Sequence, residues 1–453
     1  MVFLKKHAKA IRFLALLAIF WGQYLVFGLV RSTDTISFEN FSPLVYPLYS
    51  VTLWVFRTLF GADRGYFLLG LFQNLLLVLG IVSINDYLKK AFRLDGFTHC
   101  LLLLISAAVF LVQKWATRSG IISSNALISE ALTIPFYLFF FRYTLQAVLE
   151  RDKRAFLFAC LFATGIILAR AQLYWVLAVV FVVRLYLAGS SRKKALLSAV
   201  LTCALIAGFV QGTRVIQNLS VEDDQSKAPS NLYLLSTAVY CSERADTALF
   251  PEGSAERQLF ILTRDWMDDP TRHAAFSYES GDLTSRHQNF EYYYDLVKGV
   301  LGYYYFELVD EGLVPDMSDM FIKLVLANPD SYLVHCGQNA LVGLIRTVAI
   351  LRPGINLVAG LFYLYLLGCL LISRKKEALK KERLMTCLGL LCTLLNALVM
   401  APGVFALSRY MFYNLPILYF CAILFLRSLV IQWREKQALR VTQSSSHHEE
   451  ELQ

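Results

Sequence analysis

Long apolar segments, separated by short polar stretches, run through almost the whole sequence. A helix that crosses a bilayer needs about 20 apolar residues. Only 17% of the 453 residues are charged and 57% are hydrophobic, whereas a soluble chain carries about 25% charged residues. The pattern therefore predicts an all-α polytopic membrane protein with about ten transmembrane helices. We expect them near 10–30, 66–86, 99–113, 127–149, 155–170, 172–189, 195–215, 354–373, 384–400 and 404–430.

The net charge of +9 is distributed as membrane topology predicts. Basic residues form short runs beside the apolar segments, for example at 5–12, 89–93, 151–154, 192–194, 374–383 and 434–440. Short basic loops mark the cytoplasmic side, so we expect both termini in the cytoplasm. The segment 216–337 is mainly acidic, which fits the opposite side. This distribution argues against a nucleic-acid partner and favours contact with membrane lipids.

These features divide the chain into four parts. We expect an N-terminal transmembrane module at 1–215, an extracytoplasmic segment at 216–353, C-terminal transmembrane helices at 354–433 and a cytoplasmic tail at 434–453. The outer segment has helical patterns at 291–309 and 316–327, and Asn328-Pro329 is typical of a further helix start. The short apolar stretch 337–352 is interpreted as an interfacial helix at its end.

The first outer loop, 31–65, contains more than a simple connection. Residues 42–62 are amphipathic, with prolines at their start and Gly61 at their end, which predicts a re-entrant or interfacial helix on the membrane surface. Asp34 lies just before it. A carboxylate there could accept a proton from an incoming hydroxyl, with Glu39 as the nearby alternative. The same residues also fit solvated carboxylates in a turn.

Further candidates lie at the outer ends of helices. Glu130 begins the fourth helix, where it fits either a functional carboxylate or a favourable first-turn charge. Arg118, Arg170 and Arg409 could bind a lipid phosphate, although snorkelling to headgroups predicts the same placement. Arg170 lies in the apolar run 155–189, so we expect two helices that meet at a turn around it.

Tyr410 adjoins Arg409 and fits an interfacial anchor as well as a substrate contact. No metal-ligand spacing of Cys and His occurs in the sequence. Cys241 and Cys336 both fall in the outer segment, and nothing in their spacing decides whether they are bonded.

Several stretches occur in an order that resembles a known enzyme family. They are YPLYSVTLWVFRTLFG after Asp34, SEALTIPFYLFFFRYTL, GIILARAQLYWVL around Arg170, LANPDSYLVH and ALSRYMFYNLPILYF around Arg409. Together they resemble the C-type (GT-C) glycosyltransferases that use polyprenyl-phosphate sugars, in particular the group related to protein O-mannosyltransferases and the lipid A aminoarabinose transferase. The likeness covers most of residues 1–430. It departs from the family where an acidic pair is common, because Asp34 is followed by Thr35.

The resemblance implies an inverting hexosyl or pentosyl transfer at the extracytoplasmic face, in a membrane that we expect to be bacterial. Asp34 would be the general base, Arg170 and Arg409 would stabilise the departing lipid phosphate, and Glu130 would orient the acceptor. The donor would be a polyprenyl-phosphate sugar, and the acceptor a glycan, lipid or protein. A divalent cation is left open, since some relatives hold one at the places of Asp34 and Glu130.

Two other functions fit parts of the pattern. A flippase or transporter of a lipid-linked saccharide would show inverted repeats and polar sites at mid-membrane, which the sequence lacks. A glycan polymerase or ligase would also have a large outer loop and outer arginines. Donor preference separates these classes, because a polymerase or ligase would use a lipid-diphosphate oligosaccharide.

Overall fold

The computed structural model describes residues 2–42, 45–116, 120–188, 192–219, 231–269, 283–350, 352–403 and 408–451, and these ranges contain helices and no strand. Eight of the helices are long and apolar enough to cross a membrane, as an all-α polytopic membrane protein requires. They lie within α1 (Val2–Phe27), α4 (Ala62–Ala91), α5 (Gly96–Ala116), α6 (Glu130–Glu150), α9 (Arg192–Leu219), α16 (Pro353–Ser373), α17 (Lys380–Met400) and α19 (Leu415–Glu451).

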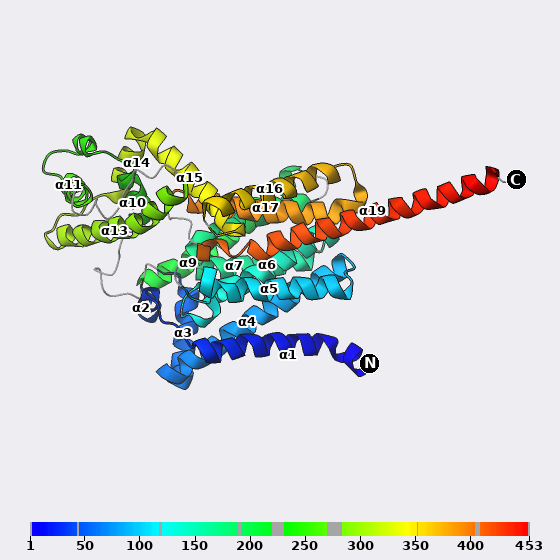
Figure 1. Ribbon diagram of the computed structural model, residues 1–453. Helices are drawn as coiled ribbons and strands as arrows, with labels where there is room; N and C mark the ends of the chain where they lie inside the picture. Colours follow the sequence, from blue (N-terminus) through cyan, green and yellow to red (C-terminus); the bar gives the residue numbers. More distant parts are fainter. Residues whose placement is uncertain are drawn as a thin grey trace.

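The bundle has two distinct ends (Figure 1). Helices α10, α11, α13 and α14 lie beyond one end, on the left of the view, and the short helices α2 and α3 lie at the same end. We call this the capped end. Both chain termini lie toward the other end. The Lys381 ammonium in the first turn of α17 donates to the carbonyl of Ala91, the last residue of α4, so the basic segments at these two helix ends meet.

Two of the ten expected spans are shorter than the rest. They are α7 (Lys153–Ala169) and the pair formed by η2 (Ala171–Trp175) and α8 (Val176–Leu187). The expected turn between them is confirmed: Arg170 has an extended backbone and separates α7 from η2.

The expectation of one continuous helix over 404–430 was wrong. Residues 404–407 lie outside the described ranges, and the segment after them forms α18 (Ser408–Met411), a turn, and then α19. Pro416 explains the break, because proline lacks the N–H that a helix interior needs and is tolerated only in the first turn. α19 then continues through the polar tail as far as Glu451.

The first loop folds into two short helices. α2 (Thr33–Glu39) precedes α3 (Pro47–Phe60), which starts later than the predicted 42–62 because Pro47 occupies its first turn. α3 is amphipathic: Tyr49 and Leu53 are fully buried, whereas Trp54 and Leu59 are largely exposed. An exposed apolar face on a short helix is typical of a membrane-surface helix.

The segment at the capped end has its own core. It consists of α10 (Leu232–Tyr240), η4 (Arg244–Leu249), α11 (Ala255–Met267), α13 (Leu283–Asp310) and α14 (Met317–Ala327). Their buried side chains, among them Leu235, Phe260, Leu301 and Met320, form a hydrophobic cluster separate from that of the bundle. The mainly helical character expected of this segment is thus present.

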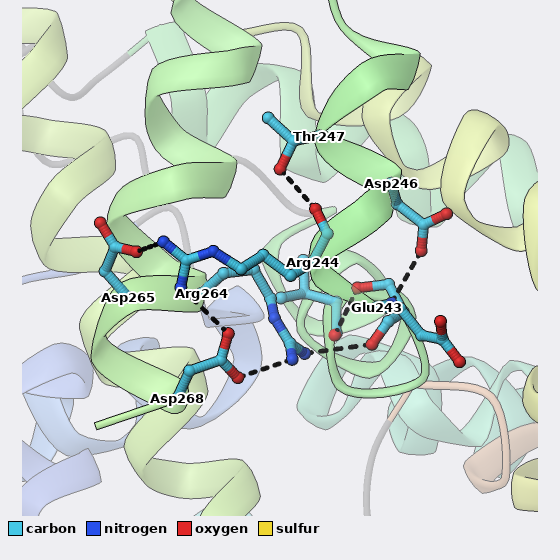
Figure 2. Close-up of polar contacts among 9 residues, drawn as sticks. Glu243, Arg244, Asp246, Thr247, Arg264, Asp265 and Asp268 are labelled. Atoms are coloured by element: carbon cyan, nitrogen blue, oxygen red, sulfur yellow. Dashed lines mark hydrogen bonds and ion pairs between the residues drawn. The ribbon is translucent and has the colours of Figure 1, made fainter. Parts of the chain in front are cut away.

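Ion pairs connect η4 to α11 on the surface of this segment (Figure 2). The Arg244 guanidinium contacts Asp265 at 2.5 Å and Asp268 at 3.4 Å, and Arg264 contacts Asp268 at 2.7 Å. Exposed pairs of this kind contribute little each. Their geometric effect is to hold η4 against α11. Asp246 of η4 also accepts a hydrogen bond from Asn328, which directly precedes α15 (Pro329–Val348).

α15 (Pro329–Val348) starts at Asn328-Pro329, as predicted. Residues 337–348 do not form a separate helix: they continue α15, whose later turns pack against the bundle. Tyr363 of α16 and Tyr419 of α19 donate to the carbonyls of Leu344 and Val348. α15 therefore connects the cap directly to the membrane bundle.

Cys241 and Cys336 are both free thiols. They lie in neighbouring segments, since the rings of Tyr240 and His335, the residues just before them, are 5.4 Å apart.

Candidate functional site: a buried carboxylate between two arginines

Backbone hydrogen bonds join the first loop to the segment before α6. Val30 pairs with Ala126 in an isolated parallel bridge, through hydrogen bonds to the carbonyl of Asn125 and from the amide of Leu127. Asn125 is almost fully buried and exchanges side-chain hydrogen bonds with Gln23 of α1. A buried amide network of this kind is rigid when its members are satisfied. It fixes the positions from which α2 and α6 begin.

Thr35 adds a second link between these two segments. Its hydroxyl donates to the carbonyl of Leu127 at 3.0 Å and accepts from the amide of Ser32 at 2.9 Å. The side chain is fully buried. Thr35 thereby ties α2, which carries Asp34, to Leu127, three residues before Glu130.

Glu130 lies between two guanidinium groups. Its Oε2 is 2.5 Å from Nη1 of Arg170, and its Oε1 is 3.6 Å from Nε of Arg409. Only 2% of the Glu130 side chain is exposed. A buried carboxylate requires such partners, because an isolated one would be strongly destabilised. Both carboxylate oxygens of Glu130 therefore face arginines. The acceptor contact that the resemblance implies for Glu130 stays a prediction.

Arg170 is held from several directions at the junction of α7 and η2. Its Nε donates to Gln172 at 2.7 Å, and its guanidinium lies 4.4 Å from the centre of the Tyr410 ring. The side chain is 10% exposed. Arg170 therefore has little freedom, and its charge is fixed beside Glu130.

Arg409 connects the buried pair to the surface. Its Nη2 donates to the Tyr410 hydroxyl at 2.8 Å and lies 3.7 Å from Oδ2 of Asp34. A quarter of the Arg409 side chain and about half of the Asp34 side chain are exposed. Burial lowers the pKa of Arg409, but the nearby Glu130, Tyr410 and Asp34 more than offset this effect, so its pKa lies above the ordinary value. Arg409 thus stays cationic next to the half-exposed Asp34.

Asp34, Glu130, Arg170, Arg409 and Tyr410 therefore come together at the capped end. Glu39 does not join them. Its carboxylate pairs with Arg31 at 2.7 Å and accepts a hydrogen bond from Tyr66, which makes it part of the packing between α2 and α4. Glu39, the alternative to Asp34 and a candidate substrate contact, therefore lies apart from the cluster. Arg118 lies outside the described residues.

Sequence reasoning missed Asn396, which positions both arginine-bearing segments. From the buried face of α17 it donates to the carbonyl of Tyr410 at 3.0 Å and accepts from the indole of Trp175 at 3.1 Å. One side chain thereby joins α18 to η2. A lone asparagine in an otherwise apolar span was the available signal, because a buried amide needs partners.

Within the described ranges, no group of three or more His, Cys, Asp or Glu side chains could hold a metal ion. Asp34 and Glu130, the two acids considered for a cation, have the Arg409 guanidinium next to both of them. A guanidinium in this place opposes a divalent cation by charge repulsion.

The fold and the site define an α-helical polytopic membrane protein with a charged cluster at the capped end. No family model, curated protein or solved structure matches the chain.

Proposed function

We propose that the protein is a membrane glycosyltransferase that moves a sugar from a polyprenyl-phosphate donor to an acceptor hydroxyl at the capped end, which we place outside the cytoplasm. The observation that carries the proposal is the position of Asp34. This half-exposed carboxylate lies 3.7 Å from Arg409, whose guanidinium also faces the buried Glu130. A base and a fixed cation are thus adjacent.

The arrangement suits departure of a phosphate. In the proposed reaction the acceptor hydroxyl gives its proton to Asp34 while its oxygen attacks the anomeric carbon. The bond from that carbon to the phosphate oxygen breaks, and its electron pair stays on the lipid phosphate. Negative charge therefore grows near Arg409, where a preorganised cation lowers the barrier. Attack opposite the leaving group inverts the anomeric centre.

Glu130 holds the Arg409 guanidinium in place beside that of Arg170. By pairing with Arg170 and Arg409 it holds two guanidinium groups close together, which would otherwise repel each other. The three side chains carry a net charge of one positive unit, which complements a phosphate. The Tyr410 ring and hydroxyl complete the support.

An apolar cavity beside the cluster suits the lipid part of the donor. It has a volume of about 560 Å³ and lies between α5, the end of α15, α16 and α19. Phe412 and Leu415, shortly after Arg409, line it, as do Val112, Tyr419 and Arg346. We call it the α5–α19 cavity. A lipid chain in this cavity would leave its phosphate near Arg409, and the resemblance to GT-C enzymes in the sequence agrees with this donor class.

The test is transfer of a radiolabelled sugar from a polyprenyl-phosphate sugar by the purified protein in liposomes made from envelope lipids. We expect Asp34→Asn to lower turnover by about 10²-fold or more. Asp63→Asn, which changes an exposed carboxylate in the first turn of α4 at the same end, should leave turnover unchanged. A folded Asp34→Asn protein with near-normal turnover would reject the assigned base. Consumption of a lipid-diphosphate oligosaccharide instead would indicate a polymerase or ligase.

A further inference from the structure

Two cysteines lie where the cap meets the bundle. Cys241 directly follows α10, and Cys336 lies in α15, the helix that connects the cap to the bundle. Both residues are partly exposed and carry free thiols. The sequence has no other cysteine between residues 216 and 353. Within the outer segment, these two can therefore pair only with each other.

The two thiols are neighbours in space. The rings of Tyr240 and His335, which directly precede the cysteines, are 5.4 Å apart. Burial raises the pKa of Cys241 to about 12, and the nearby Cys336 adds to this effect. An electrostatic effect of one side chain on another falls with distance, so it requires that the two lie close together. The ring contact and the interaction of the thiols thus place Cys336 beside Cys241.

Tyr332, one turn before Cys336 in α15, gives a second indication of this proximity. Burial raises the pKa of its hydroxyl, and both Cys336 and Cys241 add to the rise. Only 8% of Tyr332 is exposed. The two cysteines therefore meet at the edge of a buried contact between the cap and α15.

The same part of α15 holds the segment that leads to Arg409. The Tyr332 hydroxyl donates to the carbonyl of Pro402 at 3.1 Å, and the Asn339 amide donates to the carbonyl of Ala401 at 3.0 Å. Both carbonyls lie between α17 and α18, and Arg409 belongs to α18. A restraint on this part of α15 therefore also acts on the segment before the charged cluster.

A metal site is the other chemistry that two thiols suggest. Together with the imidazole of His335 they resemble part of a zinc site. Among the residues that the structure describes, however, no three such side chains come together around one point. Oxidation of the two thiols to a disulfide needs no third ligand.

We propose that Cys241 and Cys336 form a disulfide when the capped end faces an oxidising compartment, and that this bond fixes the cap to α15. The inference rests on the proposed location of the capped end outside the cytoplasm, where disulfides persist, and is independent of sugar transfer. The bond would close a loop of about 95 residues that contains most of the cap, and closing a long loop restrains the unfolded chain. On the cap side it would act through Leu235 of α10, which is fully buried in the core of the cap.

The reaction is a thiol–disulfide exchange. The thiolate of one cysteine attacks the disulfide bond of an oxidant such as oxidised glutathione, and one glutathione leaves. The second cysteine attacks the mixed disulfide and releases the second glutathione. The two protein thiols thus lose two electrons, which reduce the oxidant to two thiols, and their two protons pass to the leaving thiolates.

The test is disulfide mapping in the purified full-length protein in detergent. The protein is reduced with dithiothreitol, freed of it and kept for a day with oxidised glutathione at about pH 8.5, because a raised thiol pKa slows the exchange. It is then denatured with N-ethylmaleimide and digested with trypsin. Tryptic peptides 228–244 and 324–346 each contain one of the two cysteines. We expect these peptides to be linked at least about tenfold more than in a sample kept in dithiothreitol.

Thermal unfolding measures what the bond does to the structure. We expect the oxidised wild type to unfold at least about 3 °C above the reduced wild type. Cys241→Ser should remove both the linked peptides and this difference, and Cys336→Ser should do the same. Cys100→Ser, at an exposed cysteine in the first turns of α5, is the matched control and should keep both.

The absence of linked peptides would overturn the proposal, whether the two thiols stay free or each binds glutathione. Linkage of either one to a different cysteine would overturn it as well. Equal unfolding temperatures of the oxidised and reduced wild type would reject the fixation of the cap. Because no readout needs sugar transfer, an inactive protein that forms the linked peptides would reject the transferase and keep the disulfide.

Discussion

Glu130 and Arg170 form an ion pair at 2.5 Å that is almost completely buried, with 2% and 10% of the two side chains exposed. They come from the start of α6 and the junction after α7, and Arg409 of α18 approaches the same carboxylate. Buried pairs seldom add net stability over apolar residues, but breaking one is costly. The pair is therefore better explained by its effect on the positions of Arg170 and Arg409 than by a gain in the stability of the fold.

The first prediction concerns this carboxylate. Glu130→Gln leaves the buried Arg170 guanidinium without a counter-charge, whereas Arg409 keeps Asp34, and the change should lower the free energy of unfolding by roughly 3–5 kcal/mol. Thermal unfolding in detergent measures the effect. Glu150→Gln, at the exposed far end of the same helix, is the matched control and should change stability by less than about 0.5 kcal/mol.

A double variant sharpens this test. Replacing Glu130 by Gln and Arg170 by Met also removes the buried Arg170 charge that the single change leaves unpaired, and should recover part of the lost stability without restoring transfer. We expect the double variant to lose less free energy of unfolding than the two single variants lose together. A loss as large as their sum, or larger, would contradict the charge pairing between Glu130 and Arg170.

A second prediction concerns Thr35, which joins α2 to the segment before α6. Thr35→Val keeps the shape but leaves the carbonyl of Leu127 and the amide of Ser32 without this partner. We expect a loss of roughly 1–3 kcal/mol and lower transfer, because Asp34 is no longer held toward Arg409. Thr133→Val, a buried threonine that bonds only within its own helix turn, should cost less in activity. Equal activity of the two variants would contradict the positioning role of Thr35.

The third prediction tests the contact between α1 and α4. A methyl group added at Gly70 would overlap the ring of Tyr24, which is buried and donates to the carbonyl of Phe67. Gly70→Ala should therefore destabilise the protein by roughly 1–3 kcal/mol. At Gly22 on α1 nothing lies within 4 Å of the added carbon, and Gly22→Ala should be neutral or stabilising by up to about 1 kcal/mol. Thermal unfolding of the two variants measures the difference, and a stabilised Gly70→Ala protein would refute this packing.

The fourth prediction is a pH dependence in the cap. The backbone amide of Asp316 donates to Glu256 at 2.9 Å, and this hydrogen bond lowers the pKa of Glu256. Because the folded pKa lies below the unfolded value of about 4.3, the stabilising contribution is complete above that value. It is lost as the pH falls through the lower folded pKa.

We therefore expect Glu256→Gln to be less stable than the wild type near neutral pH and to approach it in acid. Thermal unfolding at several pH values measures this convergence. Glu252→Gln, at a side chain that is 91% exposed, should follow the wild type throughout. A constant difference between Glu256→Gln and the wild type would exclude the carboxylate as its source.

Hydropathy and charge predicted much of the fold. The long apolar helices, the turn at Arg170 and the start of α15 at Asn328 depend on local signals, namely apolar length, an isolated charge and an Asn-Pro cap. The break between α18 and α19 was missed, although Pro416 signals it. The burial of α15 could not be read locally, because an amphipathic helix fits a membrane surface and a protein groove equally well.

Sequence patterns by themselves determined that this chain is a helical membrane protein with candidate charges at one end of its helices. Only the tertiary structure decided which charges meet. Asp34 and Glu39 share one short helix, yet five residues turn their side chains roughly 140° apart, so one faces Arg409 and the other Tyr66. Apolar length is a property of a continuous segment, whereas an ion pair depends on how distant segments pack, and no single segment contains that information.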